Sequence, residues 1–340
     1  MNNNENLNLQ NDESDVTPTN KVMKERDIHQ IATAQKIKKI LGRILVYTFL
    51  SIMALVVLFP FYFMIISSLK TLAEYNLPVP TLIPQKIRLE TYTSILTGQH
   101  ESFDLFLLLR NTMYVGIVST ILSLVITIFS AFAFARLKFK GKNALFAALL
   151  GTMMIPGELF TITNYATVMK QDSWFKVVFN GLGNMFGLFG PDFKIPMVDS
   201  TYAALIVPFL VSIFYIYLLR QNFLQIPNEL YLAAKVDGTS DFKYLCKVMI
   251  PLALPTIISI TILKMMGAWN SYMWPNLVAH DKNYRLITNG LRNAFSDVSG
   301  NTDYPAQMAA VALVSLPLFL VFIFLRKYIM KGVSRSGIKG

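Results

Sequence analysis

Six long apolar runs constrain this chain more than any other feature of its sequence. They cover about residues 44–68, 111–135, 143–166, 202–219, 252–273 and 306–328. A helix needs about 20 residues to cross the ~30 Å hydrocarbon core of a bilayer. The chain is also 54% hydrophobic and only 15% charged, whereas soluble domains carry roughly 25% charged residues. The sequence therefore predicts an all-α integral membrane protein with six transmembrane helices.

The net charge of +11 follows the loops between these runs. Basic residues gather before the first run, after the second, between the fourth and fifth, and after the sixth. Loops rich in lysine and arginine stay in the cytoplasm. We therefore expect both termini to be cytoplasmic, and the loops at 70–110, 167–201 and 274–305 to face outward. A charge that follows topology in this way predicts a lipid membrane, and no nucleic acid, as its partner.

The polar ends of the chain divide it further. Residues 1–43 are expected to be a disordered, basic cytoplasmic leader, within which 21–43 could lie as a helix on the anionic inner leaflet. The six-helix domain is predicted over 44–328, with an extracellular insertion at about 167–201. Residues 329–340 form a cytoplasmic tail. The first apolar run follows a long polar leader, so we expect no cleavable signal peptide.

A basic helical hairpin is predicted between the fourth and fifth apolar runs, over about 226–251. Residues 230–236 are typical of a short helix, and Gly238 stands where a left-handed C-cap belongs. Ser240 can cap a second helix, which Pro251 is expected to stop. An amphipathic hairpin at the membrane face suits docking into a groove of another protein. An ordinary surface hairpin between two helices is the alternative.

The hairpin resembles the "EAA" coupling loop of permease subunits in binding-protein-dependent ABC importers. The matching residues are Ile226, Pro227, Glu229, Ala233, Ala234, Asp237, Gly238, Pro251, Leu252 and Pro255. The resemblance implies that the ATPase-coupling residues are Glu229, Ala233, Ala234, Asp237, Gly238 and Pro251. Leu232 departs from the family, because it occupies the position of the loop's namesake glutamate.

The resemblance extends over nearly all of the chain from residue 44 onward. Asn111 opens the second run where the family has Asn-Ser, with Thr112 in place of the serine, and residues 131–141 match the family's alanine-rich end of that span. In the third run, Pro156 and Gly157 predict a kink or an unwound turn. Such a break either lines a transport path or only serves packing.

The fifth run contains candidate substrate contacts. Trp269 and Asn270 stand in a segment that resembles the sugar-uptake branch of these permeases, and their side chains suit recognition of a sugar ring. A membrane-interface belt is the alternative for such aromatic residues. Lys264 is an unexpected charge inside a span, where it should face a cavity or a partner, or snorkel to the interface. We therefore expect Lys264, Trp269 and Asn270 to mark the substrate path.

Residues 331–340 resemble the closing segment of maltose-type permeases. In that family the tail reaches the ATPase, which implies an ATPase contact at Gly332, Lys339 and Gly340. A floppy basic tail without a partner is the alternative.

Taken together, the resemblance implies the permease subunit of an ATP-driven carbohydrate importer in the bacterial plasma membrane. Its implied partners are a second homologous permease, a dimer of cytoplasmic ABC ATPases, an extracellular solute-binding protein and the sugar. The sequence has no Walker motif and no metal-spaced His or Cys set. We therefore expect no catalytic residue, metal or cofactor on this chain, because ATP and Mg²⁺ would bind the ATPase.

Two other kinds of transporter remain open from the sequence. The first is an ABC permease for a non-sugar solute. The second is an ion-coupled secondary transporter, which would need an intramembrane carboxylate such as Glu158. A membrane-anchored interaction protein is a third possibility, but it would leave the hairpin without a purpose.

Overall fold

A computed structural model of the chain describes residues 18–100, 103–169, 202–295 and 302–334. The chain divides into two compact parts, Met1–Phe63 and Met64–Gly340. Each part is described by itself.

The first part is helical throughout its described residues. Helix α1 (Pro18–Ser68) runs through the basic leader and the first predicted span, and it continues into the second part. Pro18 is its first residue, a position that proline favours because its missing N–H has no helical acceptor there. The leader is therefore helical from residue 18 onward, which corrects the prediction of disorder over 18–43. Residues 1–17 lie outside the described residues.

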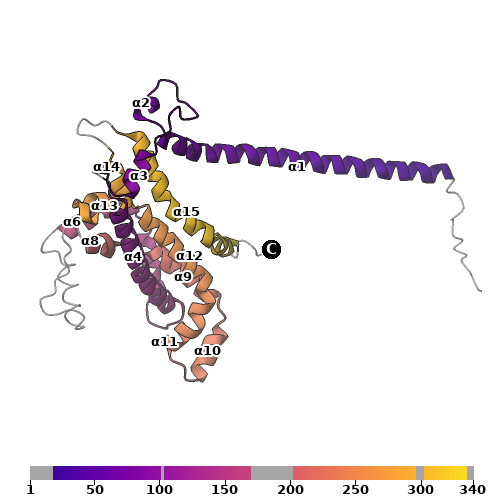
Figure 1. Ribbon diagram of the computed structural model, residues 1–340. Coiled ribbons are helices and arrows are strands. Elements are labelled where there is room, and N and C mark those ends of the chain that lie inside the picture. Colours follow the sequence, from indigo (N-terminus) through magenta and orange to yellow (C-terminus); the bar gives the residue numbers. More distant parts are fainter. Residues whose placement is uncertain (1–17, 101–102, 170–201, 296–301, 335–340) are drawn as a thin grey trace, which may run out of the picture. The chain divides into compact units, whose positions relative to one another are not determined.

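The second part is built from helices of very different lengths (Figure 1). Its elements are α2 (Leu72–Tyr75), α3 (Glu90–Leu96), α4 (Leu105–Ala135), α5 (Lys142–Thr152), α6 (Gly157–Met169), α8 (Tyr202–Ile206), the 3₁₀ turn η1 (Val207–Phe209), α9 (Ile213–Gln225), α10 (Asn228–Val236), α11 (Asp241–Tyr244), the π-turn η2 (Leu245–Met249), α12 (Ile250–Trp269), α13 (Met273–Val278), the 3₁₀ turn η3 (Lys282–Tyr284), α14 (Ile287–Asn293) and α15 (Tyr304–Ser334).

Six membrane spans can be assigned by length and composition among the described residues. Four are continuous helices, Lys36–Ser68, Leu105–Ala135, Asp241–Trp269 and Tyr304–Phe324. The other two are bent pairs, Lys142–Thr152 with Gly157–Met169 and Tyr202–Phe209 with Ile213–Gln225. With each pair taken as one span, the number agrees with the six predicted. The all-helical membrane fold is confirmed.

The break in the third span lies where Pro156 and Gly157 predicted it. Helix α5 ends at Thr152, α6 begins at Gly157, and the two helices meet at 92°. The fourth span is also bent, by 48° between Phe209 and Ile213, and no break was predicted there. Proline in the 3₁₀ turn before this point cannot continue an α-helical hydrogen-bond ladder. Ser212 then caps α9 by accepting a 3.5 Å hydrogen bond from the backbone N–H of Tyr215.

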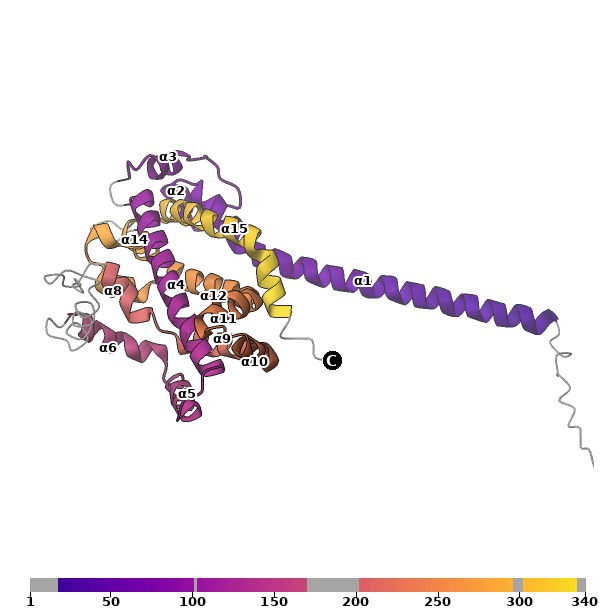
Figure 2. The same ribbon diagram turned by 90° about the horizontal axis from the view of Figure 1, so that it is seen from below.

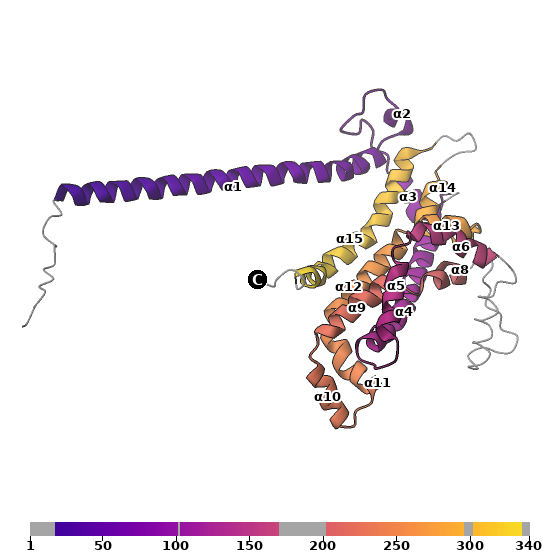
Figure 3. The same ribbon diagram turned by 180° about the vertical axis from the view of Figure 1, so that it is seen from behind.

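Helix α4 is the central element of the second part. Figure 2 shows it crossing the middle of this part, and it packs against α9 and α12. Ala131 and Ala135 are buried at one end of this contact, where small side chains let helices approach closely. Figure 3 shows the hairpin of α10 and α11 at one end of this part and helices α8, α13 and α14 at the other.

Candidate functional site

The turn of the hairpin depends on the backbone of Gly238. Its φ of +70° lies in the left-handed region, as predicted. The N–H of Thr239 donates to the Ala234 carbonyl at 2.9 Å, and that of Gly238 donates to the Lys235 carbonyl at 3.1 Å. These two bonds form a Schellman motif that closes the C-terminus of α10. Space around Gly238 is open, so the demand for glycine comes from the backbone and not from crowding within this chain.

The second arm of the hairpin is continuous with the fifth span. Ser240 caps α11 as predicted, by accepting a 3.3 Å hydrogen bond from the Lys243 N–H. The prediction that Pro251 stops this helix is wrong. The π-turn Leu245–Met249 shifts the hydrogen-bond register just before Pro251, which then falls in the first turn of α12. Proline is tolerated in a first turn because its N–H is not needed there. The hairpin is therefore joined to α12 without a break.

A polar cluster ties the two arms of the hairpin together. Lys235 Nζ lies 2.8 Å from Asp241 Oδ1, and the Tyr231 hydroxyl donates a 2.7 Å hydrogen bond to the same oxygen. The hydrogen bond to Asp241 raises the pKa of the Lys235 ammonium. Asp241 also stands in the first turn of α11, where a negative charge is favourable. The hairpin is thus a braced unit.

The outer surface of the hairpin carries apolar side chains and the residues predicted for ATPase coupling. Glu229, Ala233, Asp237 and Gly238 are exposed, whereas Ala234 is half-buried. Pro251 is exposed, but it belongs to α12 rather than to the hairpin itself. Around these residues lie four exposed apolar side chains: Leu230, Leu232, Val236 and Phe242. Val236 is 88% exposed. Such a patch is typical of a protein interaction surface.

A cavity of about 340 Å³ lies further along the same helices, toward their other end; its wall is mainly apolar, and it is called the polar cavity here for the lysine and serines that it also contains. Its walls are formed by α4, α12 and α13, and by the break between η1 and α9. Lys264 lines this cavity and donates a 2.6 Å hydrogen bond from Nζ to the carbonyl oxygen of Phe209. The other polar or aromatic lining residues include Ser119, Phe209, Ser212, Tyr215, Ser271 and Trp274. The cavity thus offers hydroxyl groups, one ammonium and aromatic faces.

The three predicted substrate-path residues do not share one cavity. Trp269 is buried and lines a separate apolar cavity of about 400 Å³ with Met265 and Phe319. Asn270 is exposed, and it is the C-cap of α12 rather than part of the lining beside Lys264. Trp274 does line the polar cavity, but its indole N–H donates 3.0 Å to the Ala204 carbonyl. Sequence reasoning missed Ser119, Ser212 and Ser271, because isolated serines in apolar runs give no distinct signal.

The N-terminal end of α4 is held by the Asn-Thr pair of the family pattern. Asn111 donates from Nδ2 to the carbonyls of Asn283 at 2.7 Å and Arg285 at 3.1 Å, and the Tyr202 hydroxyl donates 2.7 Å to its Oδ1. Thr112 Oγ1 accepts a 2.9 Å bond from the N–H of Ile287. Threonine supplies the same acceptor as serine, which explains why this departure is tolerated.

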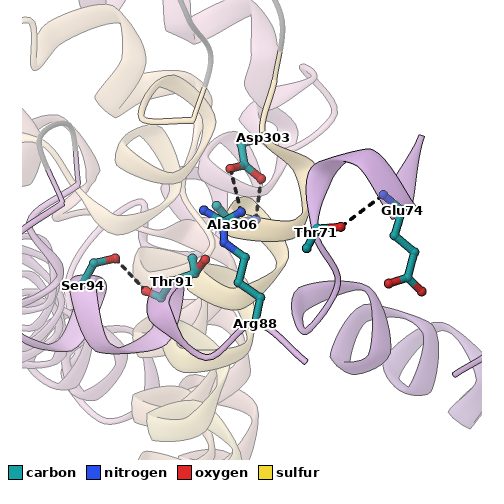
Figure 4. Close-up of polar contacts among 7 residues, drawn as sticks. All are labelled: Thr71, Glu74, Arg88, Thr91, Ser94, Asp303 and Ala306. Carbon is teal, nitrogen blue, oxygen red and sulfur yellow. Dashed lines mark hydrogen bonds and ion pairs between the residues drawn. The ribbon is translucent and has the colours of Figure 1, made fainter. Parts of the chain in front are cut away.

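The loop after α1 is fastened to the start of α15, as Figure 4 shows. Arg88 Nη1 lies 3.5 Å from Asp303 Oδ2, while Oδ1 of the same carboxylate accepts a 3.0 Å bond from the Ala306 N–H. In the same loop, Thr71 caps α2 by accepting a 3.3 Å bond from the Glu74 N–H. This region is a structured cap at the end opposite the hairpin.

The remaining predicted site residues fall at or beyond the described part of the chain. Gly332 lies in the last turns of α15 (Tyr304–Ser334). Lys339 and Gly340 lie outside the described residues, as does nearly all of the predicted insertion at 167–201.

Comparison with known proteins gives a consistent picture. The sequence pattern of the family described as "Binding-protein-dependent transport system inner membrane component" matches residues 108–335. The arabinooligosaccharides transport system permease protein AraQ of Bacillus subtilis is 27% identical, over 88% of this chain and 96% of its own. The sn-glycerol-3-phosphate transport system permease protein UgpE of Rhizobium meliloti is also 27% identical, over 87% and 97%.

A solved structure supports the fold. It is the crystal structure of a bacterial ABC transporter involved in the import of the acidic polysaccharide alginate, and one chain of it superposes with a TM-score of 0.66. The match covers 87% of this chain and 97% of that chain at 21% identity. The matched family pattern covers about two thirds of the sequence and includes the hairpin, the polar cavity and α4 from Leu108 onward. The chain therefore belongs to the family of binding-protein-dependent transport system inner membrane components.

Proposed function

We propose that this chain is the permease subunit of an ATP-driven importer that moves carbohydrate into a bacterial cell. The observation that carries the proposal is the braced hairpin of α10 and α11, whose exposed surface carries four large apolar side chains and whose second arm continues into α12. A surface of this kind suits insertion into a groove of another protein. Relatives named for arabinooligosaccharide and sn-glycerol-3-phosphate transport support the choice of solute class.

The proposed assembly contains four kinds of protein. This chain pairs with a second homologous permease, both hairpins dock on a cytoplasmic ATPase dimer, and an extracellular solute-binding protein delivers the sugar. ATP and Mg²⁺ bind the ATPase subunits, so this chain hydrolyses nothing itself. Both termini and the hairpin then lie on the cytoplasmic side, in agreement with the distribution of basic loops.

Transport in this proposal proceeds by alternating access. Closure of the ATPase dimer around ATP moves the hairpin, and the spans shift from an inward-open to an outward-open arrangement. Because α12 is joined to the hairpin and also lines the cavity beside Lys264, one continuous helix links the dock to the solute path. Nucleotide and loaded binding protein each bias the same two-state element, which is what coupling between two sites requires.

The polar cavity is the proposed solute path in this subunit. Its serine hydroxyls and aromatic rings suit a polyhydroxylated molecule. The ammonium of Lys264 would pair with a carboxylate, so acidic sugars such as uronates fit this cavity better than neutral ones. Trp269 and Asn270 lie outside this lining, which leaves Lys264 as the proposed contact.

Co-expression with the ATPase, the second permease and the binding protein tests the proposal. The purified complex in lipid vesicles should hydrolyse ATP, and sugar-loaded binding protein should stimulate it. A thermal-shift screen of the binding protein against neutral and acidic sugars and non-sugar solutes identifies the solute. Failure of this chain to form an ATPase complex would refute the proposal, and a non-sugar ligand would restrict it to the family assignment.

A further inference from the structure

Arg136 connects the end of α4 to the point where the hairpin begins. It directly follows the last residue of α4, and its side chain is buried, with 8% exposure. Its Nη2 donates hydrogen bonds to the carbonyl oxygens of Phe223 at 3.0 Å and Ile226 at 2.5 Å. Nη1 lies 3.5 Å from the Asn228 side-chain oxygen. One guanidinium thus contacts the last turn of α9, the residue before Pro227 and the first residue of α10.

The carbonyls that Arg136 binds lie at the C-terminus of α9, where that of Phe223 also accepts a 3.3 Å hydrogen bond from the Ile226 N–H. The last four carbonyl groups of an α-helix have no N–H donor in the i+4 position of the helix, and the C-terminus carries a partial negative charge. Pro227 has no N–H, so it cannot donate a hydrogen bond to the carbonyl groups at the end of α9 (Ile213–Gln225). A buried guanidinium with several donors in a fixed plane satisfies both carbonyls at once.

A second arginine makes the reverse connection. Arg220 of α9 donates from Nε to the Phe134 carbonyl at 3.1 Å, near the end of α4. Its guanidinium carbon also lies 4.1 Å from the centre of the Phe146 ring, at the start of the third span. The ends of α4 and α9 are therefore bound to each other in both directions.

The second arm of the hairpin reaches the same point. Tyr244 of α11 is 1% exposed, and it lies in one buried cluster with Ala135 and Ile226, which flank the Arg136 site. Its ring packs edge-on against Tyr231 of α10, with 5.1 Å between ring centres. Phe132 and Phe223 belong to the same buried cluster. Both arms of the hairpin thus pack into the buried cluster at the C-terminal end of α4.

We propose that Arg136 is a positioning residue that passes movement of the hairpin to α4. This inference rests on the proposed function. The hairpin is joined along the chain to α9 and α12, but α4 can follow it only through side-chain contacts. From Arg136 to Ser119 in the cavity wall, α4 spans 17 residues, or about 25 Å of continuous helix at ~1.5 Å per residue. Movement of the hairpin would therefore reach α4 in addition to α9 and α12, and all three helices line the cavity.

Two variants of Arg136 test this in the complete transporter, reconstituted in lipid vesicles. Arg136→Met keeps the length and apolar stem but removes every donor. We expect this variant to assemble and to hydrolyse ATP, while the amount of sugar moved per ATP falls about tenfold and the response to loaded binding protein is lost. Arg136→Lys should be intermediate, because a single ammonium cannot reproduce the planar set of donors.

The control is Lys138→Met, which removes an exposed positive charge two residues away. It should leave the ratio of sugar to ATP unchanged. If Arg136→Met does not assemble, Arg136→Lys decides the question. A thermal midpoint lowered in either variant, with a normal ratio of sugar to ATP, would mean that Arg136 only stabilises the fold, and the proposal would be wrong.

The proposed function fails in a different way. In that case the unmodified chain forms no ATPase complex. Failure of the Arg136 proposal instead appears as normal coupling in a complex that forms and works.

Discussion

The ammonium of Lys264 in α12 donates a 2.6 Å hydrogen bond to the carbonyl oxygen of Phe209, at the break in the fourth span. Phe209 is the last residue of the 3₁₀ turn η1, so its carbonyl group is not part of a regular α-helix. The ammonium of Lys264 provides the hydrogen-bond donor for this carbonyl oxygen. A lysine inside a span costs ~2.5–3.5 kcal/mol on insertion scales, so it is normally solvated or paired. The polar cavity supplies both an acceptor and room for a solute to compete for the charge.

We predict that Lys264→Met reduces transport of the native substrate by about tenfold or more. The loss of a charge-assisted hydrogen bond, worth about 1.5–3 kcal/mol, sets this scale. Uptake of labelled substrate into vesicles measures it, with Lys282→Met as a control that removes an exposed lysine away from the cavity lining. An acidic sugar should lose more than a neutral one of the same size. Unchanged transport would identify Lys264 as a snorkelling residue.

Gly238→Asp should abolish uptake while the protein still inserts in the membrane. The left-handed φ of +70° disfavours a residue with a Cβ. A charged side chain at this exposed position would also interfere with docking of the hairpin. Gly238→Asn has nearly the same shape and tolerates this conformation without a charge, so it should retain more activity. Uptake and membrane content are measured together. Normal ATP-driven uptake by Gly238→Asp at normal expression would contradict the docking assignment.

Much of the fold could be predicted because membrane spans and helix caps have local causes. The six runs, the break at Pro156, the left-handed Gly238 and the Ser240 cap each depend on residues close in sequence. The continuation of the helix past Pro251 could not be predicted. It depends on a π-turn at Leu245–Met249, which has no simple sequence signal.

The candidate site was less predictable because it is assembled from distant segments. Trp269 and Lys264 are five residues apart in one helix and so point in different directions, at about 100° per residue. Their separation into two cavities follows from this geometry. Arg136 was visible only as a basic residue after a span. Its bonds to Phe223 and Ile226, roughly 90 residues away, depend on how α4 and α9 pack.

Because Leu232 is apolar, we predict that the contact between the hairpin and the ATPase depends little on salt concentration. It is 54% exposed on α10, at the position where the family has a glutamate. Apolar contacts are not screened by ions, whereas exposed charge pairs lose much of their strength beyond ~0.15 M salt. Transport at graded ionic strength should fall less in this protein than in its Leu232→Glu variant. Equal salt dependence in the two would show that Leu232 lies outside the contact.

Deletion of Ile338, Lys339 and Gly340 should reduce coupling without unfolding the six spans. These residues follow α15, and the family resemblance implies that they reach the ATPase. The ratio of sugar moved to ATP hydrolysed should fall, while the thermal midpoint of the complex should not change, because the deleted residues lie outside the six predicted spans. An unchanged ratio would favour a tail without a partner.

The pair of Lys235 and Asp241 should brace the hairpin at neutral pH and cease to do so in strong alkali. The hydrogen bond to Asp241 raises the pKa of Lys235. A group whose pKa is higher in the folded state stabilises that state below its unfolded pKa, and the effect is lost as pH rises through the folded value. The loss therefore begins above about 10.4, the ordinary pKa of lysine. Proteolysis of the hairpin at graded pH measures it.

Exchange of the two charges separates pairing from helix position. Lys235→Asp with Asp241→Lys keeps an ion pair of opposite sense, but it places a cation in the first turn of α11 and an anion in the last turn of α10. Both placements oppose the helix dipoles. The exchange should therefore restore only part of the protease resistance lost in Lys235→Met. Full restoration would mean that the ion pair alone holds the arms together, and no restoration would mean that helix position dominates.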